Sequence, residues 1–150
     1  MSNVSIVYDA ILARLGVLFP TKYRIPKTNN LENNNANLMR NAYGIKVDSV
    51  SLEPSEFCNY AYSVNIGVIL SEEIVATDSQ YEQEDTAAKN LLEDMNTVIK
   101  DFIASNQINI EANVEKIDFV SCNGVESIVG TKNNFVYIKP IFNFYIRENL

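Results

Sequence analysis

Residues 60–78 read YAYSVNIGVILSEEIVATD, and residues 79–106 follow directly as SQYEQEDTAAKNLLEDMNTVIKDFIASN. In the first stretch, polar and apolar side chains alternate with a period of two, which is typical of a strand with one buried face. One face carries Tyr62, Val64, Ile66, Val68 and Leu70. The other carries Ala61, Ser63, Asn65, Gly67 and Ser71, with the apolar Ile69 as the exception.

The strand is long for the domain that contains it. About fifteen extended residues span about 50 Å at roughly 3.4 Å each, whereas a compact domain of this length is only about 40 Å across. We therefore expect the strand to bend, to break at a bulge, or to project and pair with another element.

The second stretch predicts an amphipathic helix that covers the sheet. Ser79 and Glu82 have the spacing of a capping box, and Glu84 and Asp85 complement the positive end of the helix dipole. One apolar face is predicted from Ala88, Leu91, Leu92, Met95, Val98, Ile99 and Phe102. The solvent-facing side is predicted from Glu93, Asp94, Lys100 and Asp101.

Upstream of the strand, residues 3–19 predict another helix, which Pro20 ends. Its apolar stripe is Val4, Val7, Ile11 and Leu15, widened by Tyr8, Leu12 and Phe19. A short strand is expected over 22–25. Residues 27–41 are rich in asparagine, which favours turns over regular structure, so we expect a surface loop there. Its length suggests a functional arm or an excursion.

Three further strands are expected. Tyr43, Ile45 and Val47 alternate with polar residues, and the turn 53–56 would join this strand to the long one as a hairpin. A strand around 116–119 precedes the turn signal Asn123-Gly124. The last strand covers 136–147, where Pro140 suggests an edge position or a bulge. The whole chain, 1–150, is then one α+β domain: a mainly antiparallel sheet with a long hairpin, packed against an N-terminal helix and a central amphipathic helix.

Composition limits the function. A net charge of −7 argues against a broad nucleic-acid-binding surface, which needs a basic face. Cys58 and Cys122 are expected to be free thiols in a reducing compartment. The N-terminus lacks the pattern of a signal peptide, and no apolar run approaches the roughly 20 residues needed to cross a membrane. We expect a soluble protein that is made, or assembled, inside a cell.

The residue types also argue against catalysis. The chain has no histidine, which removes the commonest general base and metal ligand. Its glycines are isolated, so no phosphate-binding loop is expected. Glu72-Glu73 and Glu82-Glu84-Asp85 could bind a cation, but carboxylates at a strand end and a helix start commonly serve capping and solubility. We expect no catalytic residue, no cofactor and no metal site.

The aromatic residues allow two interpretations. Strand aromatics such as Tyr60, Tyr62, Tyr137 and Tyr145 could form a stacking platform for single-stranded nucleic acid. Such platforms lie in basic grooves, and this chain is acidic. Packing in the core or at a subunit interface is the better interpretation.

The chain resembles the tail-terminator (tail-completion) proteins of long-tailed bacteriophages and, more broadly, small head–tail neck proteins. The resemblance rests on an order of elements. These are the N-terminal helix ending at Leu18-Phe19-Pro20, the strand 43–47, the long strand ending at 74–78, the acidic helix with Leu91-Leu92-Glu93-Asp94, the segment 115–121, and a closing aromatic strand.

The resemblance implies a structural virion protein. It would form a ring, typically a hexamer, that caps the tail tube, docks to the head-side neck or stopper protein, and lets DNA pass through its lumen as cargo. An acidic lumen would repel phosphate and let DNA slide. The candidate interface residues are Leu31, Leu38, Met39, Arg40, Tyr60, Tyr62, Glu72, Glu73, Tyr137 and Tyr145. Other readings are another neck component (a stopper or an adaptor), a small soluble binding or regulatory module, or an enzyme that uses only carboxylates.

Overall fold

A computed structural model describes residues 2–25, 41–54, 59–74, 80–105, 108, 114–129 and 134–149. In chain order the helices and strands are α1 (Asn3–Leu18), β1 (Tyr23–Arg24), β2 (Ala42–Pro54), β3 (Asn59–Ile74), α2 (Gln80–Ile99), the π-helical turn η2 (Lys100–Ala104), β4 (Val114–Ser121), β5 (Glu126–Val129), β6 (Asn134–Ile138) and β7 (Ile141–Asn149). The asparagine-rich segment, the turn after β2 and the predicted N-cap Ser79 lie outside the described residues.

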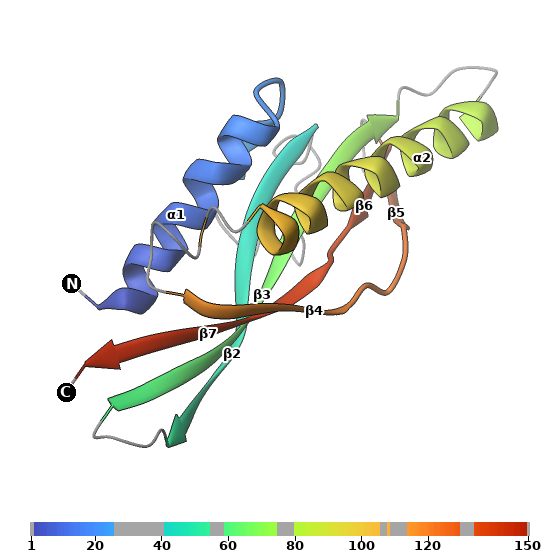
Figure 1. Ribbon diagram of the computed structural model, residues 1–150. Coiled ribbons are helices and arrows are strands. Elements are labelled where there is room, and N and C mark those ends of the chain that lie inside the picture. Colours follow the sequence, from blue (N-terminus) through green and yellow to red (C-terminus); the bar gives the residue numbers. More distant parts are fainter. Residues whose placement is uncertain are drawn as a thin grey trace.

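Strand β3 organises the sheet (Figure 1). Along one side it pairs with β2 over most of its length. Along its other side it pairs first with β7 and then with β6, both antiparallel. Strand β4 extends the sheet beyond β7, β5 extends it beyond β6, and β1 adds two residues in parallel to the start of β2. The predicted α+β fold with a mainly antiparallel sheet and a long hairpin is confirmed.

Both helices cover the same face of the sheet (Figure 1). The predicted apolar stripe of α1 is buried at Val7, Ile11 and Leu15, and α2 buries Leu91 and Val98. They meet the even-numbered side chains of β3 and the aromatic face of β7, where each large buried side chain contributes roughly 1.5–3 kcal/mol. These strand residues are Val64, Ile66, Val68, Leu70, Phe142, Phe144 and Ile146.

The sides predicted for the helical stretch 79–106 differ from the structure at Leu92 of α2 and at Asp101 of η2. Leu92, placed on the apolar face, is 44 % exposed. Asp101, placed on the solvent side, is buried, and its carboxylate accepts two hydrogen bonds from the guanidinium of Arg14, at 2.6 and 2.8 Å. The difference comes from a tertiary contact. Arg14 of α1 lies beside η2, and its positive charge compensates for the burial of the Asp101 carboxylate.

The long strand is unbroken over 16 residues. The irregularity lies in its partner, because the register shifts by one residue between Val47 and Ser49, which leaves Asp48 as a bulge. Strand β2 runs to Pro54, so the first two residues of the predicted turn 53–56 belong to the strand. As a result, the far end of the β2–β3 hairpin extends past both helices (Figure 1).

The C-terminal strands correct two predictions. Two strands were expected after α2, and four are present: β5 was not predicted, and the predicted last strand is divided into β6 and β7. Asn123-Gly124 lies in the interruption between β4 and β5, with Gly124 at φ 95°, so it is not a hairpin turn. Pro140 lies at neither an edge nor a bulge: Ile138 pairs with Leu70 and Ile141 with Gly67, so the register is kept.

Pro140 therefore occupies an interior strand. Its carbonyl accepts a hydrogen bond from the Val68 N–H at 2.9 Å. Proline has no N–H to return to Val68, so this residue pair keeps one of its two ladder bonds. The missing hydrogen bond lies beside the gap between β4 and β5, so the sheet is interrupted there on both strands. Near it, Cys122 is a free thiol, as expected, and Cys58 lies outside the described residues.

Candidate functional site

The outer half of β2 exposes an apolar strip. The bulge at Asp48 changes the parity of the strand, so that Val50 pairs with Val64 and Leu52 with Tyr62 on the helix-covered face. Because neither helix covers this end of the hairpin, Val47, Val50 and Leu52 are 37 %, 52 % and 56 % exposed. We call these three residues the β2 strip.

The backbone edge beside this strip is open. Among the described strands, β1 alone pairs with the outer side of β2, and only at Ala42 and Tyr43. From Gly44 to Pro54 the outward-facing N–H and C=O groups of β2 therefore have no partner strand in the described part of the chain. An open edge is a template for another strand.

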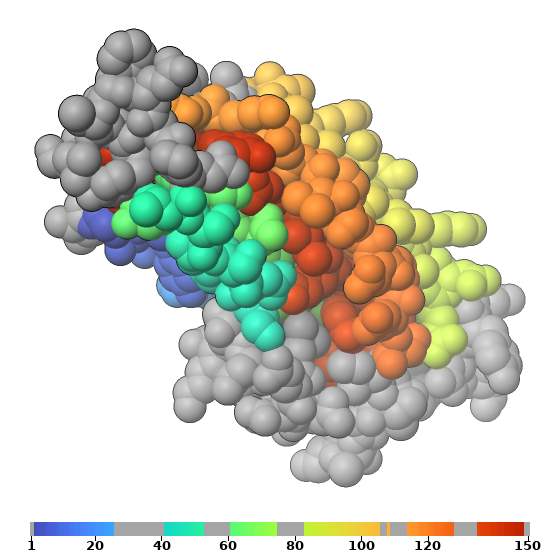
Figure 2. Space-filling view, turned by 90° about the horizontal axis from the view of Figure 1, so that it is seen from below, coloured from blue at the N-terminus to red at the C-terminus, as the bar shows by residue number. Residues whose placement is uncertain are grey.

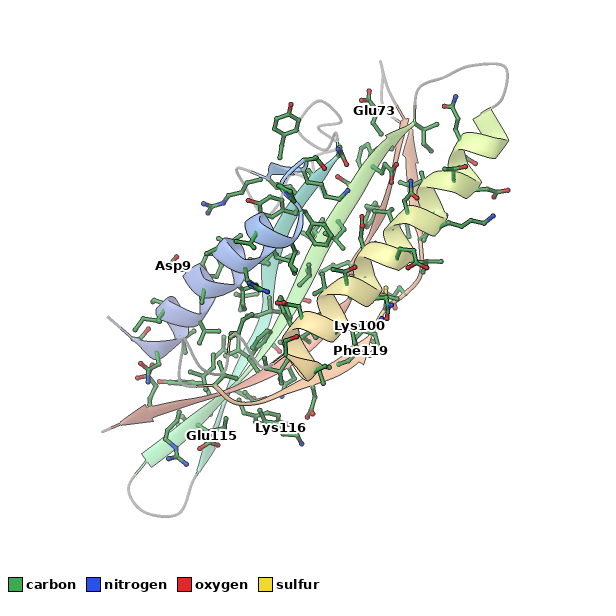
Figure 3. The ribbon with its side chains drawn as sticks, turned by 45° about the horizontal axis from the view of Figure 1, so that its top comes forward. Asp9, Glu73, Lys100, Glu115, Lys116 and Phe119 are labelled. Atoms are coloured by element: carbon green, nitrogen blue, oxygen red, sulfur yellow. The ribbon has the colours of Figure 1, made fainter. Side chains whose placement is uncertain are left out.

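The opposite edge of the sheet has the same character. Strand β4 pairs with β7 on one side and with no described strand on the other. Phe119 is 39 % exposed and Val120, a bulge residue, is 51 % exposed. The inner side of the Phe119 ring packs edge-to-face on Phe142, with centroids 5.6 Å apart. We call Phe119 and Val120 the β4 strip; Phe119 is labelled in Figure 3.

The face of the sheet away from the helices is polar around Ser63 and Asn143, whereas a second apolar cluster of Ile25, Ala42, Ile69 and Phe135 is buried on it further along β3. Figure 2 shows atoms of β2, β3, β7 and β4 side by side on this surface, with no helix over them. Ser63 and Asn143 are hydrogen-bonded across β3 and β7 at 2.9 Å, and the Lys116 ammonium lies 5.6 Å from the centre of the Tyr145 ring. Lys116 also pairs with Asp118 at 3.3 Å, and Arg147 pairs with Glu115. The charges on this face balance locally.

A polar groove lies between the end of α1, the end of β3 and α2, with a volume of about 410 Å³. The buried Lys22 ammonium donates to Asn41 Oδ1 at 2.9 Å and to the Ser71 carbonyl at 3.0 Å, and lies 3.6 Å from Asp94. Burial raises the pKa of the Asp94 carboxyl, against the lowering effect of Lys22. These groups satisfy one another, which favours a role in joining β1, β3 and α2.

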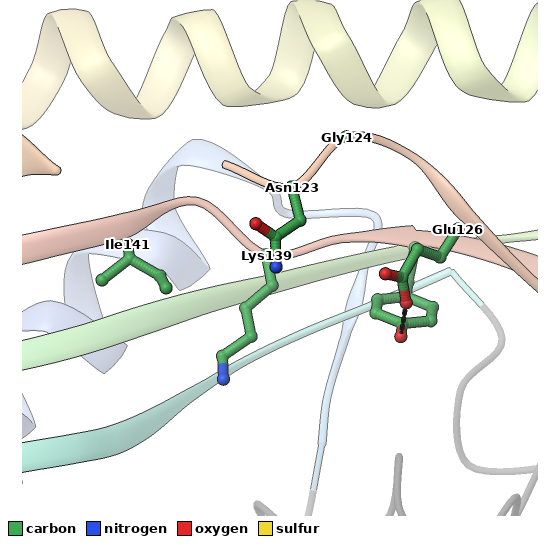
Figure 4. A pocket seen from close by; sticks show the side chains of 6 residues that line it. Asn123, Gly124, Glu126, Lys139 and Ile141 are labelled. Atoms are coloured by element: carbon green, nitrogen blue, oxygen red, sulfur yellow. Dashed lines mark hydrogen bonds between the residues drawn. The ribbon is translucent and has the colours of Figure 1, made fainter. Parts of the chain in front are cut away.

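A smaller cavity of about 120 Å³ lies where the C-terminal strands are interrupted (Figure 4). It is lined by Asn123, Gly124, Glu126, Tyr137, Lys139 and Ile141. The Tyr137 hydroxyl donates a hydrogen bond to the Glu126 carboxylate. Burial is the larger cause and the Glu126 carboxylate the smaller cause, and together they raise the pKa of Tyr137 to about 12. A tyrosine that holds its proton this firmly is a poor general base.

The structure places the predicted interface residues in several different regions. Leu31, Leu38, Met39 and Arg40 lie outside the described residues, as does the side chain of Tyr60. Tyr62 faces the helix side, next to Leu52, whereas Tyr145 lies on the open face. Glu72 and Glu73 lie at the far end of β3 from β4 residues Glu115 and Lys116 (Figure 3). Tyr137 belongs to the small cavity.

Among the predicted residues whose side chains the structure describes, only Tyr62 is adjacent to an exposed apolar strip. The β2 strip was not predicted, because the alternation was followed only over Tyr43, Ile45 and Val47. A signal was present: in Ser49-Val50-Ser51-Leu52 polar and apolar residues alternate, which is typical of a continuing strand. Recognising it required a bulge at Asp48, where the alternation changes parity.

Comparisons with known proteins give no family. No protein-family model matches the chain, and no curated protein is significantly similar to it. No described helix is long and apolar enough to cross a membrane. Within the described ranges, no three His, Cys, Asp or Glu side chains stand close enough together to hold a metal ion.

Proposed function

We propose that this protein is a structural component of a bacteriophage virion, acting at the neck as a tail terminator. Copies of the chain assemble into a ring, a hexamer in the resembling family, that caps the tail tube and docks to the head-side neck or stopper protein. DNA passes through the lumen as cargo. Assembly takes place in the host cytoplasm.

The observation that carries this proposal is the exposed β2 strip, at the end of the β2–β3 hairpin that neither helix covers. Val50 and Leu52 are each more than half exposed, whereas Ile45 of the same strand is 1 % exposed. Exposed apolar side chains that gather on one face of a strand favour a site that another protein covers. A subunit that is complete only in an assembly is built in this way.

The charge of the chain supports the same role. Duplex DNA is held mainly through contacts between cationic side chains and phosphates. With a net charge of −7, and with Lys116 and Arg147 already paired to carboxylates on the open face, this chain offers little to hold a phosphate backbone. A ring lined by such subunits would let DNA slide through.

The test has two readouts. The purified protein is examined by light scattering and negative-stain microscopy, and is then added to tail tubes assembled from the tube protein of the same virus. We expect rings of about six subunits that sit at tube ends and stop tube growth. Leu52→Ser tests the β2 strip, and Val17→Ser is its matched control, because Val17 is 66 % exposed on α1 and lies outside both strips. Leu52→Ser should weaken ring formation, and Val17→Ser should leave it unchanged.

Other outcomes contradict the proposal. Rings that bind the head-side connector and ignore tube ends would identify a stopper or an adaptor. A chain that stays monomeric and binds neither tube ends nor the connector would be a small binding module. Retention of the protein on DNA at physiological salt would contradict the passive role of the lumen.

A further inference from the structure

We infer that the open edge of β2 in one copy pairs with the open edge of β4 in a second copy, so that the sheets of neighbouring subunits join edge to edge. The inference deepens the proposed ring, and rests on it, by naming the contact between subunits. Its occupant is a second copy of this chain.

Strand direction fits this pairing without any inversion of the second copy. Strand β2 is antiparallel to β3, β3 to β7, and β7 to β4. Strand β4 therefore runs opposite to β2. A second copy placed beside the first in the same orientation presents its β4 antiparallel to the first copy's β2, and antiparallel ladders are the more stable kind.

The side chains also continue across the junction. On the helix-covered face the register defines rows that cross four strands. One row runs from Val47 through Ile66 and Phe142 to Phe119. The next begins at Val50 and runs through Val64 and Phe144 to Ile117.

The first row ends in an exposed apolar side chain at both edges, with Val47 37 % exposed and Phe119 39 % exposed. A neighbouring copy at the same height brings Phe119 beside Val47, and each then covers the other. Because both belong to the same face, the joined sheet continues its apolar rows on its helix side.

The chemistry of the two edges favours pairing. Natural sheets protect free edges with charges, prolines or bulges. Strand β2 has a bulge at Asp48 and β4 has bulges at Glu115 and Val120, but beyond its bulge, from Ser49 to Leu52, β2 has no charge and no proline. The nearby charge of Asp48 is engaged by Lys139 at 3.0 Å. On β4, Lys116 is engaged by Asp118.

The two edges are different surfaces, so the contact is heterologous. Each copy uses its β2 edge for one neighbour and its β4 edge for the other, which builds a closed ring or an open helix. A two-fold contact of β2 with β2 would instead stop at a dimer.

The experiment blocks one edge at a time. Variant A carries Val50→Lys and Leu52→Lys, variant B carries Phe119→Lys and Val120→Lys, and Val17→Lys is the control. All changed side chains are exposed, so each variant is expected to fold, as circular dichroism and thermal unfolding would verify. We expect A and B each to be monomeric, and an equimolar mixture to form a dimer that grows no further. The mixture does so because A keeps its β4 edge and B keeps its β2 edge.

A cross-link gives a second readout that needs no disruptive charge. In a background with Cys58→Ser and Cys122→Ser, the pair Val47→Cys and Phe119→Cys should form disulfides between copies under mild oxidation. Within one copy the two positions are separated by three strand spacings, roughly 14 Å, which is too far for a disulfide. A ladder of covalent oligomers is expected on a denaturing gel, with Val17→Cys plus Phe119→Cys giving none.

Several results would overturn the inference. These are a wild-type chain that stays monomeric at high concentration, oligomers that persist in both A and B, and dimers of B alone, which would indicate a β2–β2 contact. The inference and the proposed function fail separately. Rings that survive the edge variants and cap tubes would leave the function standing, and edge-paired rings that ignore tube ends would leave the inference standing.

Discussion

The Lys139 ammonium lies 3.0 Å from the Asp48 carboxylate, and the side chain between them crosses β3 directly over Gly67. The bulge that places Asp48 and the glycine that admits the lysine act together, because a Cβ at position 67 would lie 2.3 Å from Lys139 Cε and 3.0 Å from Cγ. The Lys139 side chain and its ion pair with Asp48 therefore link β2 to the β6–β7 junction across β3.

The first prediction concerns the sign of Gly67→Ala. In the wild-type background the new methyl group displaces Lys139, and overpacking of this kind costs about 1 kcal/mol or more. In a Lys139→Ala background the clash is gone, and Gly67→Ala should stabilise by about 0.5–1 kcal/mol because glycine is unfavourable within a strand. Urea unfolding of the four proteins in this cycle measures both values. The same sign in both backgrounds would show that Lys139 does not restrict position 67.

The second prediction uses the asymmetry of the Arg14–Asp101 pair. The Asp101 side chain is 7 % exposed and that of Arg14 is 27 % exposed. Arg14→Met leaves a buried carboxylate without its guanidinium, whereas Asp101→Asn leaves a cation that water still reaches. We expect Arg14→Met to lower the free energy of unfolding by about 3 kcal/mol, and Asp101→Asn by roughly half as much. Equal losses in urea unfolding would contradict this explanation.

Local pattern predicts much of this fold. The period of two placed Val64, Val68 and Leu70 in the core, and the 3.6-residue period did the same for Ile11 and Leu91. Both predictions rest on the spacing of residues close together in the sequence, which can be read from the sequence alone.

Long-range relationships could not be predicted in this way. Asp101 looks solvent-facing until Arg14, 87 residues away, is placed beside it. The β2 strip depends on a one-residue bulge, which reverses the outward and inward sides of every residue after Asp48. The two open edges depend on which strand pairs with which, and a single sequence does not contain that information. The candidate assembly surface therefore became visible only in three dimensions.

The third prediction is an alkaline titration. Burial and the Glu126 carboxylate raise the pKa of Tyr137 from 10.0 to about 12 in the folded protein. Because the folded state holds this proton more tightly than the unfolded state, the group's contribution to stability is full below pH 10 and is lost as the pH rises toward 12. Ultraviolet absorbance of tyrosinate measures the titration. Glu126→Gln should lower the pKa of Tyr137 but not restore the ordinary value, since burial is the larger cause. A titration unchanged by Glu126→Gln would contradict the assignment.

The fourth prediction concerns how α1 is fixed to the sheet. The Glu148 carboxylate of β7 accepts from the backbone N–H of Asn3, and lies 3.3 Å from the Val4 N–H, so a strand residue caps the start of a helix 145 residues earlier. Negative charge at this position also meets the positive end of the helix dipole. Glu148→Ala should therefore cost about 1 kcal/mol of folding free energy.

A matched control is Glu115→Ala. Glu115 of β4 forms an ion pair with Arg147, which lies in β7 as Glu148 does. This pair is exposed: the Glu115 side chain is 40 % accessible and that of Arg147 is 57 % accessible. Exposed ion pairs contribute about 0–1 kcal/mol, so this variant should unfold close to the wild type. Urea unfolding at low and high salt separates the two cases. The loss in Glu148→Ala should shrink only partly with salt, because its hydrogen bonds to the helix start remain when the charge is screened. If Glu115→Ala proved the more damaging variant, the capping role of Glu148 would be wrong.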